Sequence, residues 1–229
     1  MCGAPGRRSP ATVSDEVMSQ YRDFVQYWPY AVLMILLVSW ALYHFVAPAD
    51  RREWVGAGLL QAFIIALYGE MYGFPLTIYL LTGFFGLDIP LAHVSGHLWA
   101  TLLGYGSVGA LVEMALGVSV MLVGALLIVK GWVKIYFAAG RLVTDGVYGL
   151  MRHPQYTGIF LVILGQLIHW PTIVTLLLSP AILAVYVRLA HREEEQLVER
   201  LGNAYRQYRQ SVPMFVPRGV ALKSMFTAG

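Results

Sequence analysis

The sequence predicts an all-α protein, a polytopic bundle of about five helices that span a membrane. Hydrophobic residues make up 58% of the chain and charged residues only 13%, whereas a soluble domain carries roughly a quarter charged residues. No lysine or arginine occurs between Glu53 and Val129. Apolar segments close to the length that crosses a bilayer alternate with short polar segments. The single cysteine, Cys2, excludes an intrachain disulfide and a multi-cysteine metal site.

The first half of the chain predicts a tail, two spans and a shallower apolar element. Residues 1–29 are predicted to form a tail that ends in an interfacial aromatic segment. The first span is placed at Tyr30–Val46, and the second at Trp54–Gly73 after a charged turn. Pro75 breaks the second span, so Leu76–Phe85 is predicted to be a separate, shallower element.

The second half predicts one further span and a membrane hairpin. The third span is placed at Leu111–Trp132, and a polar stretch, Gly140–Pro154, follows it. The apolar segment Gln155–Leu189 is too long for one crossing of a core of about 30 Å, and Pro171 interrupts it. Two antiparallel arms are therefore expected, and a charged helical tail is expected from His191 to Tyr208.

Basic residues predict how the bundle is oriented. Arginines and lysines lie beside the ends of the spans that share one face, whereas the loop Gly86–Gly96 on the other face has none. The positive-inside rule then places the C-terminus in the cytoplasm, and we expect a bacterial cytoplasmic membrane protein with lipids as partners and no nucleic-acid partner. We expect four regions: the tail 1–29, an N-terminal membrane region 30–110 of unassigned role, a core 111–217 and a C-terminal tail 218–229.

A glycine motif in the first half of the chain does not predict nucleotide binding. Residues 104–109 match the dinucleotide fingerprint G-x-G-x-x-G, which requires a preceding strand and a following helix in a soluble βαβ unit. Here the glycines lie in an apolar segment, so they predict a bend or close packing of helices.

Two polar clusters flank the predicted hairpin. Arg152–Gly158 precedes it and His191–Glu195 follows it. A hairpin returns both clusters to the same membrane face, where they can share one site. Taken singly, these residues are typical of an interfacial loop and a solvated helix face.

Together the clusters resemble the isoprenylcysteine carboxyl methyltransferase family. Its superfamily also includes phospholipid N-methyltransferases and small-thiol methyltransferases. The resemblance covers roughly Gly117 to Pro217. The matching positions are Leu142-Val143-Thr144-x-Gly146-Val147-Tyr148, Arg152-His153-Pro154-x-Tyr156-x-Gly158, Glu193-Glu194-x-x-Leu197, Leu201-Gly202, Tyr205, Tyr208 and Val212-Pro213.

The resemblance implies a helix bundle that encloses S-adenosyl-L-methionine at its cytosolic end and releases S-adenosyl-L-homocysteine. Tyrosine rings can face a sulfonium by cation–π attraction, and a glutamate can accept from ribose hydroxyls or an amine. The implied cofactor contacts are Gly140, Arg141, Leu142, Val143, Tyr148, His153, Pro154, Gln155, Tyr156 and Glu193.

The resemblance also implies a lipophilic small-molecule or lipidated acceptor, with carboxyl O-methylation as the leading reaction. The family carries an arginine a few residues before its paired glutamates, and Leu189 occupies that position here. Arg188 and Arg192 are the neighbouring candidates for orienting a carboxylate, and Glu194 completes the predicted catalytic set. Lipid-amine N-methylation and small-thiol S-methylation remain alternatives.

A different class of function is also compatible with the sequence. Glu70 lies in a predicted span, and His93 and His97 are four residues apart, so a helix would place both imidazoles on one face. These three residues could form a metal site in a non-catalytic binding or redox module. Structural roles inside the bundle are the other interpretation, and the leading prediction contains no metal.

Overall fold

The computed structural model describes residues 26–45, 51–89, 93–138 and 141–217, together with Ser19 and Arg22. Within these ranges the chain forms helices and no strand. The described elements are α2 (Trp28–Phe45), α3 (Arg51–Tyr72), α4 (Leu76–Gly83), η1 (His93–Gly96), α5 (Leu98–Leu102), α6 (Gly106–Ala138), α7 (Val147–Leu150), α8 (Pro154–His169), α9 (Ile173–Leu201) and α10 (Asn203–Ser211).

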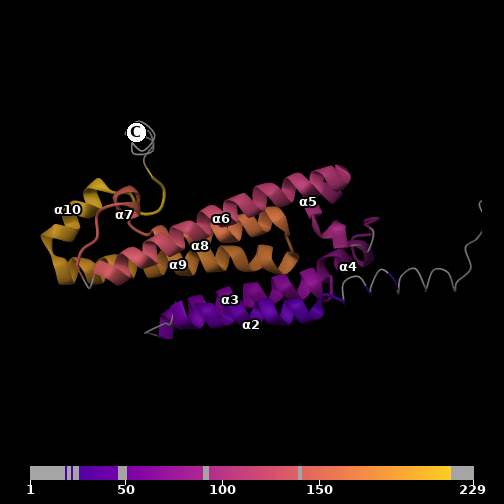
Figure 1. The fold of residues 1–229 in the computed structure, drawn as a ribbon, viewed down its shortest axis with the longest axis horizontal. Coiled ribbons are helices and arrows are strands. Elements are labelled where there is room, and N and C mark those ends of the chain that lie inside the picture. The colour runs from indigo at the N-terminus through magenta and orange to yellow at the C-terminus, as the bar shows by residue number, and fades with distance from the viewer. Residues whose placement is uncertain are drawn as a thin grey trace, which may run out of the picture.

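The long helices α2, α3, α6, α8 and α9 run along the length of the bundle, and the short elements gather at its two ends (Figure 1). α7 and α10 lie at one end, while α4 and α5 lie at the other. Within the described residues, three helical segments are long and apolar enough to cross a membrane: Trp54–Tyr72, α6 and α9. This confirms the predicted polytopic helix bundle.

In the two remaining long helices, α2 and α8, the apolar segment is shorter than a typical membrane span. The apolar part of α2 is Trp28–Ala41. α8 has 16 residues, about 24 Å of helix, which is less than the ~30 Å hydrocarbon core. A five-span topology therefore stays a prediction at α2 and α8.

Two boundaries differ from the prediction. α6 has 33 residues and extends beyond the predicted span Leu111–Trp132 at both ends, because no proline interrupts the chain between Gly106 and Ala138. The positive φ angles of Gly104 (72°) and Gly106 (57°) separate it from α5, so the glycine motif forms a bend, as predicted. The tail predicted as one helix from His191 is broken at Gly202, where φ is 58°.

Glu70 and His97 are bound within the protein at the end of the bundle that carries α4 and α5. A Glu70 carboxylate oxygen accepts from the backbone N–H of Thr77 in the first turn of α4, at 2.8 Å. His97 Nδ1 lies 3.0 Å from the carbonyl oxygen of His169. The side chain of His93 lies outside the described set, and no group of three metal-ligand side chains occurs among the residues that were described.

A line of glycines lets α6 and α8 pack backbone against backbone. Gly117 and Gly124 of α6 face Gly165 and Gly158 of α8, in antiparallel register. A Cβ atom built on Gly117 would lie 2.6 Å from the carbonyl oxygen of Gly165, and one on Gly124 would lie 2.6 Å from that of Gly158. Gly131 continues the line to the start of α8. Small residues at such spacing allow close helix association in membranes.

The first and second halves of the chain share one core. Side chains of α3 pack among those of α8 and α9. The buried members of this core are Leu60, Phe63, Ile64, Leu67, Ile159, Ile163, Trp170, Ile182 and Tyr186.

The glycine line makes a stability prediction. Gly124→Ala places a methyl group against the backbone of α8 and should destabilise the fold by about 1–3 kcal/mol through overpacking. Gly58→Ala is the matched control, because a Cβ on Gly58 meets nothing within 4 Å. Thermal melting of both variants in detergent tests this. Equal melting temperatures for both variants would show that the two backbones do not pack as described.

Candidate functional site

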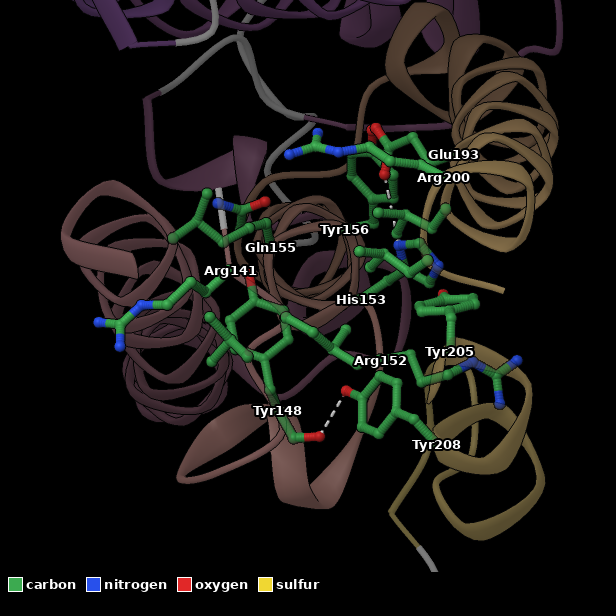
Figure 2. Close-up of a pocket in the computed structure, with 15 residues that line it drawn as sticks. Arg141, Tyr148, Arg152, His153, Gln155, Tyr156, Glu193, Arg200, Tyr205 and Tyr208 are labelled. Atoms are coloured by element: carbon green, nitrogen blue, oxygen red, sulfur yellow. Dashed lines mark hydrogen bonds and ion pairs between the residues drawn. The ribbon is translucent and has the colours of Figure 1, made fainter. Parts of the chain in front are cut away.

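Predicted cofactor residues meet in one cavity at the end of the bundle that carries α7 and α10 (Figure 2). Its volume is about 210 Å³. The predicted residues that line it are Arg141, Leu142, Val143, Tyr148, His153, Gln155, Tyr156 and Glu193. Pro154 is buried at the first position of α8 and does not appear in the lining. Gly140 lies outside the described residues.

The start of α8 presents His153 and Tyr156 together. His153 is the N-cap of α8 and Pro154 its first residue, a position where the missing proline N–H costs no helical hydrogen bond. The two rings are stacked, with centroids 5.6 Å apart and planes 4° apart. The backbone N–H of His153 donates to the carbonyl of Met214 at 3.0 Å. The C-terminal segment therefore fixes this turn from outside.

A buried ion pair joins three segments of the site: the turn before α8, helix α9 and the end of α10. Arg152 Nε donates to Glu194 Oε1 at 2.6 Å, and the two side chains are 9% and 1% exposed. The Arg152 guanidinium also donates to the backbone carbonyls of Arg209, at 2.9 Å, and Val212. Because these bonds satisfy several guanidinium donors, burying the pair costs less than burying the charges alone.

The two consecutive glutamates face different surroundings. Glu194 points to Arg152 and is absent from the cavity lining, while Glu193 lines the cavity. The Tyr156 hydroxyl donates to Glu193 Oε1, and His153 Nδ1 lies 3.6 Å from Glu193 Oε2. The Glu193 side chain is 43% exposed, so its carboxylate remains accessible from the cavity.

Three tyrosines form the side of the cavity next to α7 and α10. The Tyr208 hydroxyl donates to the carbonyl of Tyr148 at 2.6 Å (Figure 2), and the Tyr148 hydroxyl donates to that of Gly131 at 3.3 Å. Burial raises the pKa of Tyr148 above its usual range and that of Tyr205 to about 12. These phenols are therefore neutral near pH 7 and act as donors and aromatic surfaces.

The predicted acceptor arginines lie outside this cavity. Arg188 and Arg192 line a separate groove of about 200 Å³ between α3 and α9, together with Val55, Val185 and Leu189. Leu189 precedes Glu193 by four residues, about one helical turn and a rise of about 6 Å. The groove thus runs along the face of α9 that continues into the cavity.

Several lining residues were not among the predicted contacts. They are Ile135, Arg152, Leu197, Arg200, Leu201, Tyr205 and Tyr208. Arg152, Leu197, Leu201, Tyr205 and Tyr208 belong to the motifs that carry the resemblance, so the signal for them was present. No sequence signal marked Ile135 and Arg200, because whether these side chains line the cavity depends on how α6 and α9 are rotated about their axes.

Comparison with known proteins agrees with the motifs. A model of the phospholipid methyltransferase family matches residues 107–204. The protein-S-isoprenylcysteine O-methyltransferase of Schizosaccharomyces pombe is 40% identical over 77 residues, which are 33% of this chain and 33% of that protein. Protein-S-isoprenylcysteine O-methyltransferase B of Arabidopsis thaliana is 33% identical over 78 residues, 34% of this chain and 40% of that protein.

These matches confirm the resemblance to the isoprenylcysteine and phospholipid methyltransferase superfamily. The chain spans between a third and two fifths of the length of the curated relatives it matches. The segment that the family model matches, residues 107–204, contains nearly all of α6 and all of α8 and α9. It therefore contains most of the residues that line the cavity.

His153 makes the stability of the protein depend on pH. Burial lowers its pKa below the usual value of 6.5, although the nearby Glu194 carboxylate acts in the opposite direction. Below about pH 6.5 the unfolded chain binds a proton that the folded protein resists, so stability should fall as the pH decreases from 6.5 toward the folded pKa.

Thermal melting between pH 7.5 and 5.0 checks this expectation. The melting temperature of the wild-type protein should fall more steeply with decreasing pH than that of His153→Gln. The other histidines are common to both proteins and cancel in the difference. Parallel pH profiles would mean that His153 does not resist protonation in the fold.

Proposed function

We propose that this protein is an integral membrane methyltransferase that binds S-adenosyl-L-methionine in the cavity at the α7 and α10 end. One observation carries the proposal. Residues from the loop after α6, from the start of α8 and from α9 were predicted as cofactor contacts, and they line a single cavity. The names of the relatives favour the same reaction class.

The chemistry of the lining fits this cofactor. The aromatic rings of Tyr148 and Tyr156 can face a cationic sulfonium. Glu193 can accept from ribose hydroxyls or the amino group, and Arg200 can pair with the cofactor carboxylate. When bound, the cofactor supplies an electrophilic methyl group whose transfer leaves a neutral thioether.

The protein is proposed to act mainly by positioning. A carboxylate acceptor is already an anion and needs no strong base, so catalysis would come from alignment and from exclusion of water. Glu194 has a positioning role in this scheme, because it holds Arg152 and His153 without lining the cavity. This differs from the direct catalytic role predicted from the sequence.

A lipophilic acceptor is proposed to enter from the bilayer through the groove between α3 and α9. Val55, Val185 and Leu189 provide an apolar surface there. Arg188 and Arg192 provide positive charges that would hold an anionic group near Glu193. Carboxyl O-methylation of a lipophilic or lipidated acceptor is therefore the favoured reaction, in a bacterial cytoplasmic membrane with the cavity on the cytoplasmic side.

Methylation of a lipid amine or a small thiol is the second candidate. The apolar Leu189 occupies the position where the family carries an arginine, which favours an acceptor without a carboxylate. Such an acceptor would have to release a proton, and the accessible Glu193 carboxylate could take it.

Cofactor binding can be measured directly. Glu193→Gln removes an accessible charge from the cavity and should weaken binding of S-adenosyl-L-homocysteine by at least about tenfold, since hydrogen bonds to charged groups contribute about 1.5–3 kcal/mol. Glu195→Gln is the matched control, because Glu195 is exposed and does not line the cavity.

Isothermal calorimetry on purified protein provides the measurement. Absence of binding at millimolar ligand would refute the methyltransferase proposal and favour a non-catalytic membrane protein. Equal affinities for the two variants would show that Glu193 does not contact the cofactor.

The acceptor groove has a separate test. With an S-isoprenylcysteine as acceptor, Arg188→Gln or Arg192→Gln should raise the acceptor KM about tenfold, because a charge-assisted contact is lost. The KM for the methyl donor should not change, and the exposed Arg206→Gln serves as the control.

An assay of labelled-methyl transfer in native membranes identifies the natural acceptor. Mass analysis of the labelled product distinguishes an ester from an N-methyl or S-methyl product. If neither arginine variant changes the acceptor KM, the acceptor is not an anion held in this groove.

A further inference from the structure

A second cavity adjoins the cofactor cavity at the loop that follows α6. Its volume is about 530 Å³, and it is formed by the end of α6 and by residues 141–145. Arg141, Leu142 and Val143 line both cavities. They are the wall that the two cavities share.

The second cavity has an apolar part and a charged part. Its apolar lining comes from Val133, Phe137 and Ala138 of α6, together with Leu142 and Val143 of the loop. Phe137 is 73% exposed at the end of a helix long enough to cross a membrane. This part of the cavity is therefore expected at the boundary between the hydrocarbon core and the headgroups, where a membrane span ends.

The charged part consists of Lys134, Arg141 and Asp145. Lys134 forms an ion pair with Asp145, and an ammonium group has three donors, so this pair leaves donors for a further acceptor. Arg141 is exposed and adds a guanidinium with several donors. The net charge of these three side chains is positive, which favours an anionic ligand.

We propose that this cavity binds an anionic phospholipid of the membrane leaflet at the α7 and α10 end. The phosphate would pair with Lys134 and Arg141, and an acyl chain would lie along Val133 and Phe137. A polar ligand without an acyl chain would leave the apolar lining in water, and a neutral lipid would leave the cations without a partner.

The site would also influence the cofactor cavity. Lys134 contacts the loop at two residues: it pairs with Asp145, and its Cε atom would lie 3.2 Å from a Cβ on Gly146. A lipid held by Lys134 and Arg141 would restrain the loop whose Leu142 and Val143 also line the cofactor cavity. Anionic lipid should therefore raise cofactor affinity; this coupling rests on the proposed function, whereas lipid binding does not.

Lipid binding is measured first, with a fluorophore-labelled phosphatidylglycerol in neutral-detergent micelles that contain the full-length protein. Lys134→Gln should weaken binding about fivefold, as expected for the loss of one interfacial charge. Asp145→Asn retains the lysine and releases it from its ion pair, so it should bind at least as tightly as the wild-type protein. Arg206→Gln removes one charge from α10, away from this cavity, and should leave binding unchanged.

Three outcomes would overturn the proposal. Equal losses for Lys134→Gln and Arg206→Gln would mean diffuse attraction to the protein surface. Equal binding of labelled phosphatidylcholine would exclude recognition of the anionic headgroup. Displacement of the labelled lipid by millimolar glycerol phosphate would mean a phosphate site that makes no use of the acyl chain.

The coupling is measured next in nanodiscs. The affinity for S-adenosyl-L-homocysteine should be higher in discs that contain phosphatidylglycerol than in discs of phosphatidylcholine alone, and Lys134→Gln should remove this difference. An affinity that does not depend on lipid composition would overturn the coupling. If the cofactor product binds in neither disc, the proposed function fails while the result of the lipid-binding measurement still stands.

Discussion

The contact between the backbones of α6 and α8 is the constraint on which the rest of the structure depends. Glycines of one helix face glycines of the other, and a single added methyl group on either side would meet a carbonyl oxygen at 2.5–2.6 Å. Close contact of this kind is possible only where glycine faces glycine, which restricts the register between the helices. That register places the first residues of α8 beside the end of α6, close to the loop from residue 141 to residue 146 and to the proposed cofactor cavity.

The neighbouring glutamates of α9 show how one helix serves both support and binding. Successive residues of a helix are rotated by about 100°, so Glu194 faces the interior while Glu193 faces the cavity. Glu194 is almost fully buried and holds Arg152, which in turn binds backbone carbonyls of the C-terminal segment. Glu193 is bound by Tyr156 and stays accessible. A substitution at Glu194 should therefore disturb folding and binding together, whereas one at Glu193 should act mainly on binding.

Much of the fold was readable from the sequence because hydrophobic length and helix breakers are local properties. Pro171 and the glycines near residue 104 marked turns that the structure contains. The break at Gly202 was missed, since one glycine in a charged helical pattern does not reveal its φ angle. The separate surroundings of Glu193 and Glu194 were also missed, because they depend on how α9 is rotated against α8. Leu189 was recognised from the sequence as a departure from the family. The groove beside it could not be predicted, because it depends on where α3 lies against α9.

The Arg152–Glu194 pair also has a consequence for the order in which the protein is made. Arg152 emerges from the ribosome 42 residues before Glu194 and 60 residues before Val212, whose carbonyl completes its hydrogen bonds. Contacts so distant in the chain form late, because loop closure must precede them. During synthesis the α6–α8 contact can already form while Arg152 still lacks its partners. The proposed cofactor cavity should therefore be completed late, and a nascent chain that ends before Val212 should lack the carbonyl that completes the hydrogen bonds of Arg152.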